Sequence, residues 1–199
     1  MRFLKENFDS VIKLFVNQIG VAIFSFFLYT AASTIAENGQ SGLAVKFAIS
    51  VFSIIFYFLL IYNVIWEIGG KDKIRIDAGR MTPQKSKGAR LSFIANLPNF
   101  IFIGIALLLF VIYMTSGNEG FKAAFAILNA LFRIFVSMYL GAIQLVCDSF
   151  SENENTYYLM QTIGFLIFPV MSIGISHFAY IMGLNNKKII NTGKTEKYE

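Results

Sequence analysis

Four long stretches without a charged residue determine what this chain can fold into. They cover residues 14–36, 47–66, 91–118 and 155–186, and the shortest of them has 20 residues. A helix that crosses the hydrocarbon core of a bilayer needs about 20 mostly apolar residues. Since backbone polar groups cannot stay unpaired in lipid, the sequence predicts that these stretches are membrane-spanning helices.

A fifth stretch, 123–147, is apolar except for Arg133. The chain is 56% hydrophobic and only 15% charged, whereas soluble domains average about 25% charged residues. Strands of a β-barrel would alternate in hydrophobicity over about ten residues, which these runs do not. The sequence therefore predicts an all-α fold, a single polytopic transmembrane helix bundle with about five spanning helices. Their expected ranges are 12–36, 44–66, 96–116, 121–147 and 158–183.

The first stretch follows a basic start, as a secretory signal peptide does. It is longer than the roughly 7–15 apolar residues of a signal core, and it contains Asn17 and Gln18. We therefore expect it to be retained as the first helix.

Positive charge predicts the orientation. The segment 67–91 has seven Lys and Arg residues against three acidic ones, so we expect a basic cytoplasmic loop in a protein of the cell membrane, with the N-terminus on the same side. Five crossings would then put the polar C-terminal tail, 184–199, outside, although it carries four lysines. The charge rule would be obeyed throughout if the segment 121–147 did not cross, so the side of the tail stays open.

A polar stripe marks the segment 121–147. Asn129, Arg133, Ser137 and Gln144 fall within about a quarter-turn of a helical wheel. Because the stripe stays in phase, we expect one unbroken crossing helix whose polar seam faces the bundle. Exposing Arg133 to lipid would cost about 2.5–3.5 kcal/mol on insertion scales. The apolar runs contain no acid, so this arginine has no obvious partner in its own chain.

The first two predicted helices carry matching faces of small and polar residues, which allow close helix packing. These residues are Gln18, Ser25, Tyr29, Ser50, Ser53 and Tyr57. For Arg133 three roles stay open. It locks the bundle or reaches the interface, it binds an anion or lipid headgroup, or it meets the carboxylate of a partner subunit.

Three further residues carry local predictions. Pro98 fits the first turn of a helix that begins near Leu97, with Asn96 as its N-cap. Pro169 lies inside the last helix, which should therefore bend and pack against neighbours. His177 is expected at the interface as a hydrogen-bonded residue, with a pH-sensitive role as the alternative.

The sequence lacks the groups that most chemistry requires. One histidine and one cysteine exclude a multi-histidine metal site and an internal disulfide. There is no HExxH motif and no pair of carboxylates in an apolar run. We expect no catalytic residue, no metal, no cofactor and no nucleic-acid partner, and hence not an enzyme.

Two functions remain from the sequence. The first is an accessory or scaffold component of a membrane complex, in contact with membrane lipids and with a partner subunit or a second copy. The alternative is a transport component or permease subunit for an anionic solute or lipid headgroup. The first is narrowly favoured, because carriers often show repeats with paired helix breaks and no repeat is apparent here.

Overall fold

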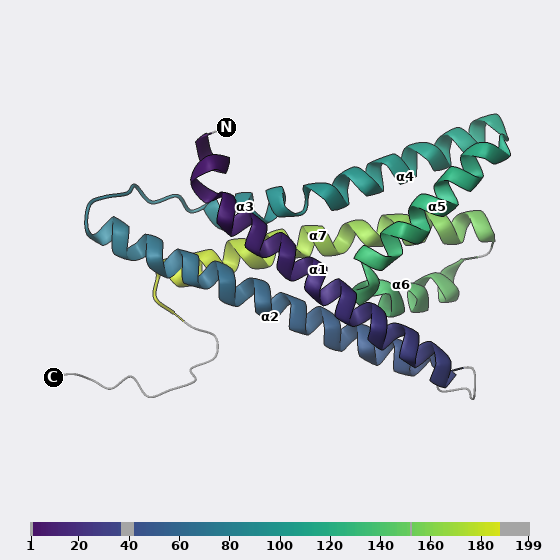
Figure 1. Ribbon diagram of the computed structural model, residues 1–199, viewed down its shortest axis with the longest axis horizontal. Coiled ribbons are helices and arrows are strands. Elements are labelled where there is room, and N and C mark those ends of the chain that lie inside the picture. Colours follow the sequence, from purple (N-terminus) through teal and green to yellow (C-terminus); the bar gives the residue numbers. More distant parts are fainter. Residues whose placement is uncertain (1, 37–41, 152, 188–199) are drawn as a thin grey trace.

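The computed structural model describes residues 2–36, 42–151 and 153–187, and within these ranges the chain forms helices and no strand. The predicted all-α bundle is confirmed (Figure 1). Of the predicted tail, residues 188–199 lie outside the described part. The helices are α1 (Arg2–Ala36), α2 (Gly42–Asp77), α3 (Lys87–Ala95), α4 (Leu97–Ser116), α5 (Glu119–Phe135), α6 (Ser137–Phe150) and α7 (Glu154–Leu184).

Four helices, α1, α2, α4 and α7, are long and apolar enough to cross a membrane. The pair α5–α6 makes a fifth candidate if the two bent helices are counted as one span. Figure 1 shows both outer ends of this pair at the same end of the bundle, beside the end of α4 and the start of α7. The two helices therefore form a bent hairpin whose tip lies inside the bundle.

The single unbroken helix expected over 121–147 is wrong. The helical backbone breaks at Val136 (φ −112°, ψ 19°), and α5 and α6 are bent by 119°. Val136 is completely buried at the tip of the hairpin. Directly after it, the Ser137 hydroxyl donates to the carbonyl of Ala22 in α1. Contacts with distant helices thus fix the break, and a wheel drawn from local sequence contains no information about them.

The loop expected over 67–91 is also wrong, because most of it is helical. α2 continues to Asp77 and α3 begins at Lys87, which leaves only residues 78–86 between them. Charged residues along the α2 extension pair one turn apart, Lys71 with Glu67 at 2.7 Å and Lys73 with Asp77 at 2.8 Å. Such pairs between side chains four residues apart stabilise a helix, so α2 can continue beyond its apolar length with its charged side chains in water.

Close approach to α7 also stabilises the α2 extension. A Cβ added at Gly183 would overlap the carbonyl of Trp66, and one at Gly69 would overlap that of Tyr180. The absence of a side chain at Gly69 and Gly183 lets the two backbones meet. α7 passes through the buried Pro169 and contacts α2, α3, α4 and α6, so its expected packing against neighbours is confirmed.

The start of α4 is partly as predicted. α4 begins at Leu97 with Pro98 in its first turn, but the Asn96 side chain does not cap it. Asn96 is buried instead, and its amide donates to the carbonyl of Ser92 and to the hydroxyl of Ser172 in α7, each at 2.9 Å. The Asn96 oxygen, which a cap would use as its acceptor, instead accepts from the side chain of Asn99 at 2.9 Å.

α1 begins earlier than expected, at Arg2, and it is kinked at Asn7 (φ −125°, ψ 16°). The Asn7 amide donates to the carbonyl of Phe3 at 2.9 Å, which closes the turn before the kink. This first turn lies at the same end of the bundle as α3 (Figure 1).

Candidate functional site

The predicted polar faces lie inside the bundle. On α1, Gln18 and Ser25 are 3% and 1% exposed, and Tyr29 is half-buried. The predicted polar residues of α2 and of the hairpin are also buried, except for Arg133 and Gln144, which are partly exposed. The fully buried members are Ser50, Ser53, Tyr57, Asn129 and Ser137.

Most of these residues serve the packing of α6. Ser50 accepts a hydrogen bond from the backbone amide of Gly141 at 2.8 Å, and the Tyr29 hydroxyl donates to the side-chain carbonyl of Gln144. Tyr57 meets the ring of Tyr139 edge-on at 6.4 Å. Together with the bond from Ser137 to α1, these contacts fix the returning arm of the hairpin between α1 and α2.

Arg133 lies at the end of α5, and its partner is Gln161 of α7. One guanidinium nitrogen, Nη2, donates to Gln161 Oε1 at 2.8 Å, and Asn129 Nδ2 approaches the same oxygen at 3.4 Å. Gln161 is completely buried. A neutral amide thus takes the place of a carboxylate, so the hydrogen bond is made while the positive charge is not neutralised.

Two donors beside this contact have no partner within the described residues, Arg133 Nε and Gln161 Nε2. A buried donor without an acceptor is unfavourable by about 1–3 kcal/mol. These two donors can therefore form hydrogen bonds to an anionic or carbonyl oxygen from outside the described residues. Gln161 was missed at the sequence level, where it is one polar residue in the 155–186 run with no local sign of a partner on α5.

Two other residues of interest are His177 and Cys147. His177 is exposed on the outer side of α7, next to the buried Ser176. Cys147 is buried with a free thiol. Neither joins the seam.

A second polar cluster, missed from sequence, lies at the opposite end of the bundle from the hairpin ends. Lys87 Nζ donates to Asp72 Oδ2 at 2.7 Å, and the Tyr180 hydroxyl donates to the same oxygen at 2.8 Å. Asp72 is 2% exposed and Lys87 is 6% exposed. Gly88, the next residue of α3, lies so close to Ser176 that a Cβ would stand 2.5 Å from its carbonyl. The cluster therefore joins α2, α3 and α7.

One signal in the sequence pointed to this cluster. Tyr57, Ile61, Ile65 and Gly69 recur every four residues along α2, and Asp72 follows three residues later on the same buried face. Apolar spacing of three to four residues indicates that a helical face continues. The charges after Trp66 hid this continuation.

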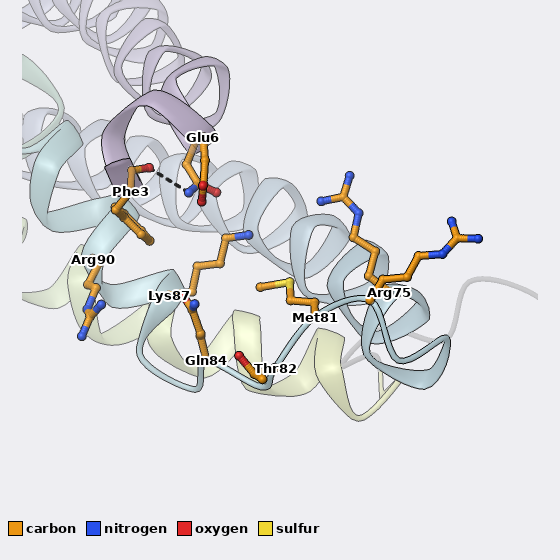
Figure 2. Close-up of a pocket in the computed structure, with 10 residues that line it drawn as sticks. Phe3, Glu6, Arg75, Met81, Thr82, Gln84, Lys87 and Arg90 are labelled. Carbon is orange, nitrogen blue, oxygen red and sulfur yellow. Dashed lines mark hydrogen bonds between the residues drawn. The ribbon is translucent and has the colours of Figure 1, made fainter. Parts of the chain in front are cut away.

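A basic pocket of about 820 Å³ opens beside the cluster. Figure 2 shows Lys87 reaching from α3 between the N-terminal turn, which carries Phe3 and Glu6, and the 78–86 loop, which carries Met81 and Thr82. Four cationic side chains line the pocket against one carboxylate. The cationic residues are Arg75, Arg80, Lys87 and Arg90.

The described residues contain no cluster of three or more His, Cys, Asp or Glu side chains that could hold a metal ion. The unpartnered Arg133 Nε and Gln161 Nε2 and the arginines of the basic pocket are instead donors and cations, which suit oxygen acceptors and anions. Comparison with known proteins gives no match: no protein family, no curated protein and no solved structure is significantly similar to this chain.

Proposed function

We propose that this chain is a multi-pass protein of the cell membrane that acts as an accessory or scaffold component of a membrane complex. The observation that carries the proposal is Arg133, a partly buried cation whose partner in its own chain is the neutral Gln161. Within a bilayer an arginine in this state favours a counter-charge. A partner subunit, or a second copy of the chain, would supply it as a carboxylate.

The arrangement of the seam supports a packing role over an open path. Ser50, Ser137 and Gln144 are hydrogen-bonded across helix interfaces, and Asn129 approaches Gln161. In a carrier, side chains along the path would be expected to face water or solute. Here they hold the hairpin in place.

The hairpin also supports an orientation. If α1, α2, α4 and α7 cross and α5–α6 returns, the N-terminus, the 78–86 loop and the end of α7 share one side of the membrane. We propose that this side is the cytoplasm, since it then collects the basic loop and the lysines that follow α7, as the charge rule requires. The acidic segment around Asp148 and Glu154 then lies outside, and the conflict found in the sequence disappears.

Co-purification tests the scaffold proposal. The tagged full-length chain, extracted from its own membranes in mild detergent, should retain a membrane partner or a second, differently tagged copy. Arg133→Leu should release that protein, Arg133→Lys should retain it in part, and Lys122→Leu, at the start of α5, should leave it bound. A complex that survives Arg133→Leu would contradict the proposal.

A transport component for an anionic solute or lipid headgroup is the second candidate, and the unpartnered Arg133 Nε and Gln161 Nε2 favour it. Both atoms are donors, so together they suit an anion. In proteoliposomes of the chain alone, such a component should take up the anion, and Arg133→Leu should abolish uptake. A scaffold should show no uptake in either form.

A further inference from the structure

Two pockets with different linings adjoin at the end of the bundle that carries α3. The basic pocket described above shares Phe3 and Arg90 with a second pocket of about 380 Å³. The second pocket is lined mainly by apolar side chains from α3 and α7. Its other lining residues are Ser86, Ala89, Phe93, Ile94 and Ile173.

Buried contacts fix the geometry of the shared wall. Lys87 is held by Asp72, so α3 cannot shift along α2 without breaking a buried ion pair. The kink at Asn7 turns the first helical turn, which places the Phe3 ring 6.0 Å from the Arg90 guanidinium. Phe3 and Arg90 thus form a boundary between a cationic and an apolar compartment.

The charge of the basic pocket is available to a ligand. Lys87 is paired, but Arg75 is 64% exposed and lies 3.8 Å from Asp72, a loose contact. Arg80 and Arg90 are exposed. Arginine binds phosphate oxygens with two parallel hydrogen bonds, which makes this side chain well suited to a phosphate group.

The location favours a lipid over a soluble anion. The basic pocket is lined by Arg75, which lies beyond the apolar length of α2, whereas the second pocket reaches Ile173 inside the apolar run of α7. Phe93, which lines the second pocket, is 48% exposed. A free anion would use the basic compartment and leave the apolar one empty. A phospholipid presents both parts, a charged headgroup at the interface and an acyl chain directed into the membrane.

We propose that these two pockets together bind one anionic phospholipid, with its headgroup phosphate beside Arg75, Arg80 and Arg90 and the upper part of an acyl chain between α3 and α7. Phe3 closes the site from the N-terminal turn. This site is separate from Arg133 and does not depend on the proposed partner subunit.

Native mass spectrometry of the full-length chain tests the proposal. The detergent-purified protein is mixed with equal amounts of phosphatidylglycerol and phosphatidylcholine that carry the same acyl chains. The wild-type chain should retain phosphatidylglycerol in preference. The double variant R80E/R90E should reduce that preference about tenfold or more, since each basic residue near an anionic headgroup contributes about 1 kcal/mol.

Lys85→Glu is the matched control, because Lys85 lies in the same exposed loop but does not line either pocket. It reverses one positive charge, as each half of the double variant R80E/R90E does, and should leave the lipid preference unchanged. Arg80→Gln, a single change on the exposed loop, repeats the test with less effect on folding. Equal retention of the two lipids by the wild type, or a preference that R80E/R90E and Arg80→Gln leave intact, would overturn the proposal.

A second pair of measurements separates a lipid from a free anion. Ala89→Trp fills the apolar pocket and should lower phosphatidylglycerol retention, while millimolar inorganic phosphate should compete only weakly with the bound lipid. If phosphate displaces the lipid completely, or if Ala89→Trp has no effect, the apolar compartment is not part of the site and the proposal fails.

Discussion

Lys87 Nζ lies 2.7 Å from Asp72 Oδ2, and both side chains are buried where α3 packs against α7 and is joined to α2 by this pair. Tyr180 donates to the same carboxylate oxygen. A segment rich in charge is therefore part of the folded core at this end of the bundle. The pair determines where the basic pocket and its apolar neighbour lie.

Removing one partner of the buried pair should destabilise the protein strongly. Lys87→Met leaves the Asp72 carboxylate without its cation, and breaking such a pair lowers the free energy of unfolding by about 3–5 kcal/mol. Thermal unfolding in detergent should show a clear decrease in Tm. The double variant D72N/K87M should recover part of it, because no buried charge remains.

Lys71→Met, which breaks the exposed pair with Glu67, serves as control and should change stability by less than about 1 kcal/mol. Similar losses for Lys71→Met and Lys87→Met would contradict this assignment.

A methyl group at Gly141 should separate α6 from α2. A Cβ at Gly141 would overlap the carbonyl of Lys46 and stand 2.6 Å from the Ser50 hydroxyl. We expect Gly141→Ala to lower stability by about 1–3 kcal/mol, as overpacking of a core does. Gly104→Ala is the control, because nothing lies within 4 Å of its added Cβ. That variant should be neutral or slightly stabilising, since alanine favours helix more than glycine. Thermal unfolding of the two variants compares them directly, and equal stability would argue against the close approach of α6 and α2.

Replacing Gln161 should lower the stability of the isolated chain more than replacing its partner Arg133. Gln161→Leu removes the acceptor and leaves a partly buried guanidinium without its partner, so the isolated chain should lose about 1–3 kcal/mol of stability. Arg133→Leu removes the charge itself, and Asn129 remains near the Gln161 oxygen at 3.4 Å. We expect the Arg133→Leu chain to stay close to the wild type in detergent. Unfolding curves of both purified variants measure the difference, and the reverse order of stability would contradict this account of the site.

Cysteine labelling should show that the hairpin returns to the side it started from. In a Cys147→Ser background, Ser116→Cys and Ser149→Cys place exposed thiols at the end of α4 and near the end of α6. A maleimide that cannot cross membranes should label both from one side. Ser86→Cys, exposed at the start of α3, should label from the other side. Labelling of Ser116→Cys and Ser149→Cys from opposite sides would instead indicate that α5–α6 crosses as a broken span.

The sequence by itself predicted an all-α chain with apolar runs long enough to span a membrane. The free energy of transfer from water to lipid is summed over about 20 apolar residues. One arginine or one proline in the run therefore does not change the prediction that it spans a membrane. The sequence also determined that α4 begins at Leu97. The polar residues of the first two helices, such as Ser50 and Ser53, were expected on one face, and the structure places them in the interior. Each of these features depends on residues close together in the chain.

Only the tertiary structure decided the break at Val136 and the pairing of Asp72 with Lys87. Ser137 and Ala22 are 115 residues apart, and Gly141 and Ser50 are 91 apart. A polar stripe in phase along a helical wheel is compatible with one helix or with two, since the wheel contains only neighbours in sequence. The bend follows from the space that α1, α2 and α7 leave between them, and that space exists only after those helices have packed.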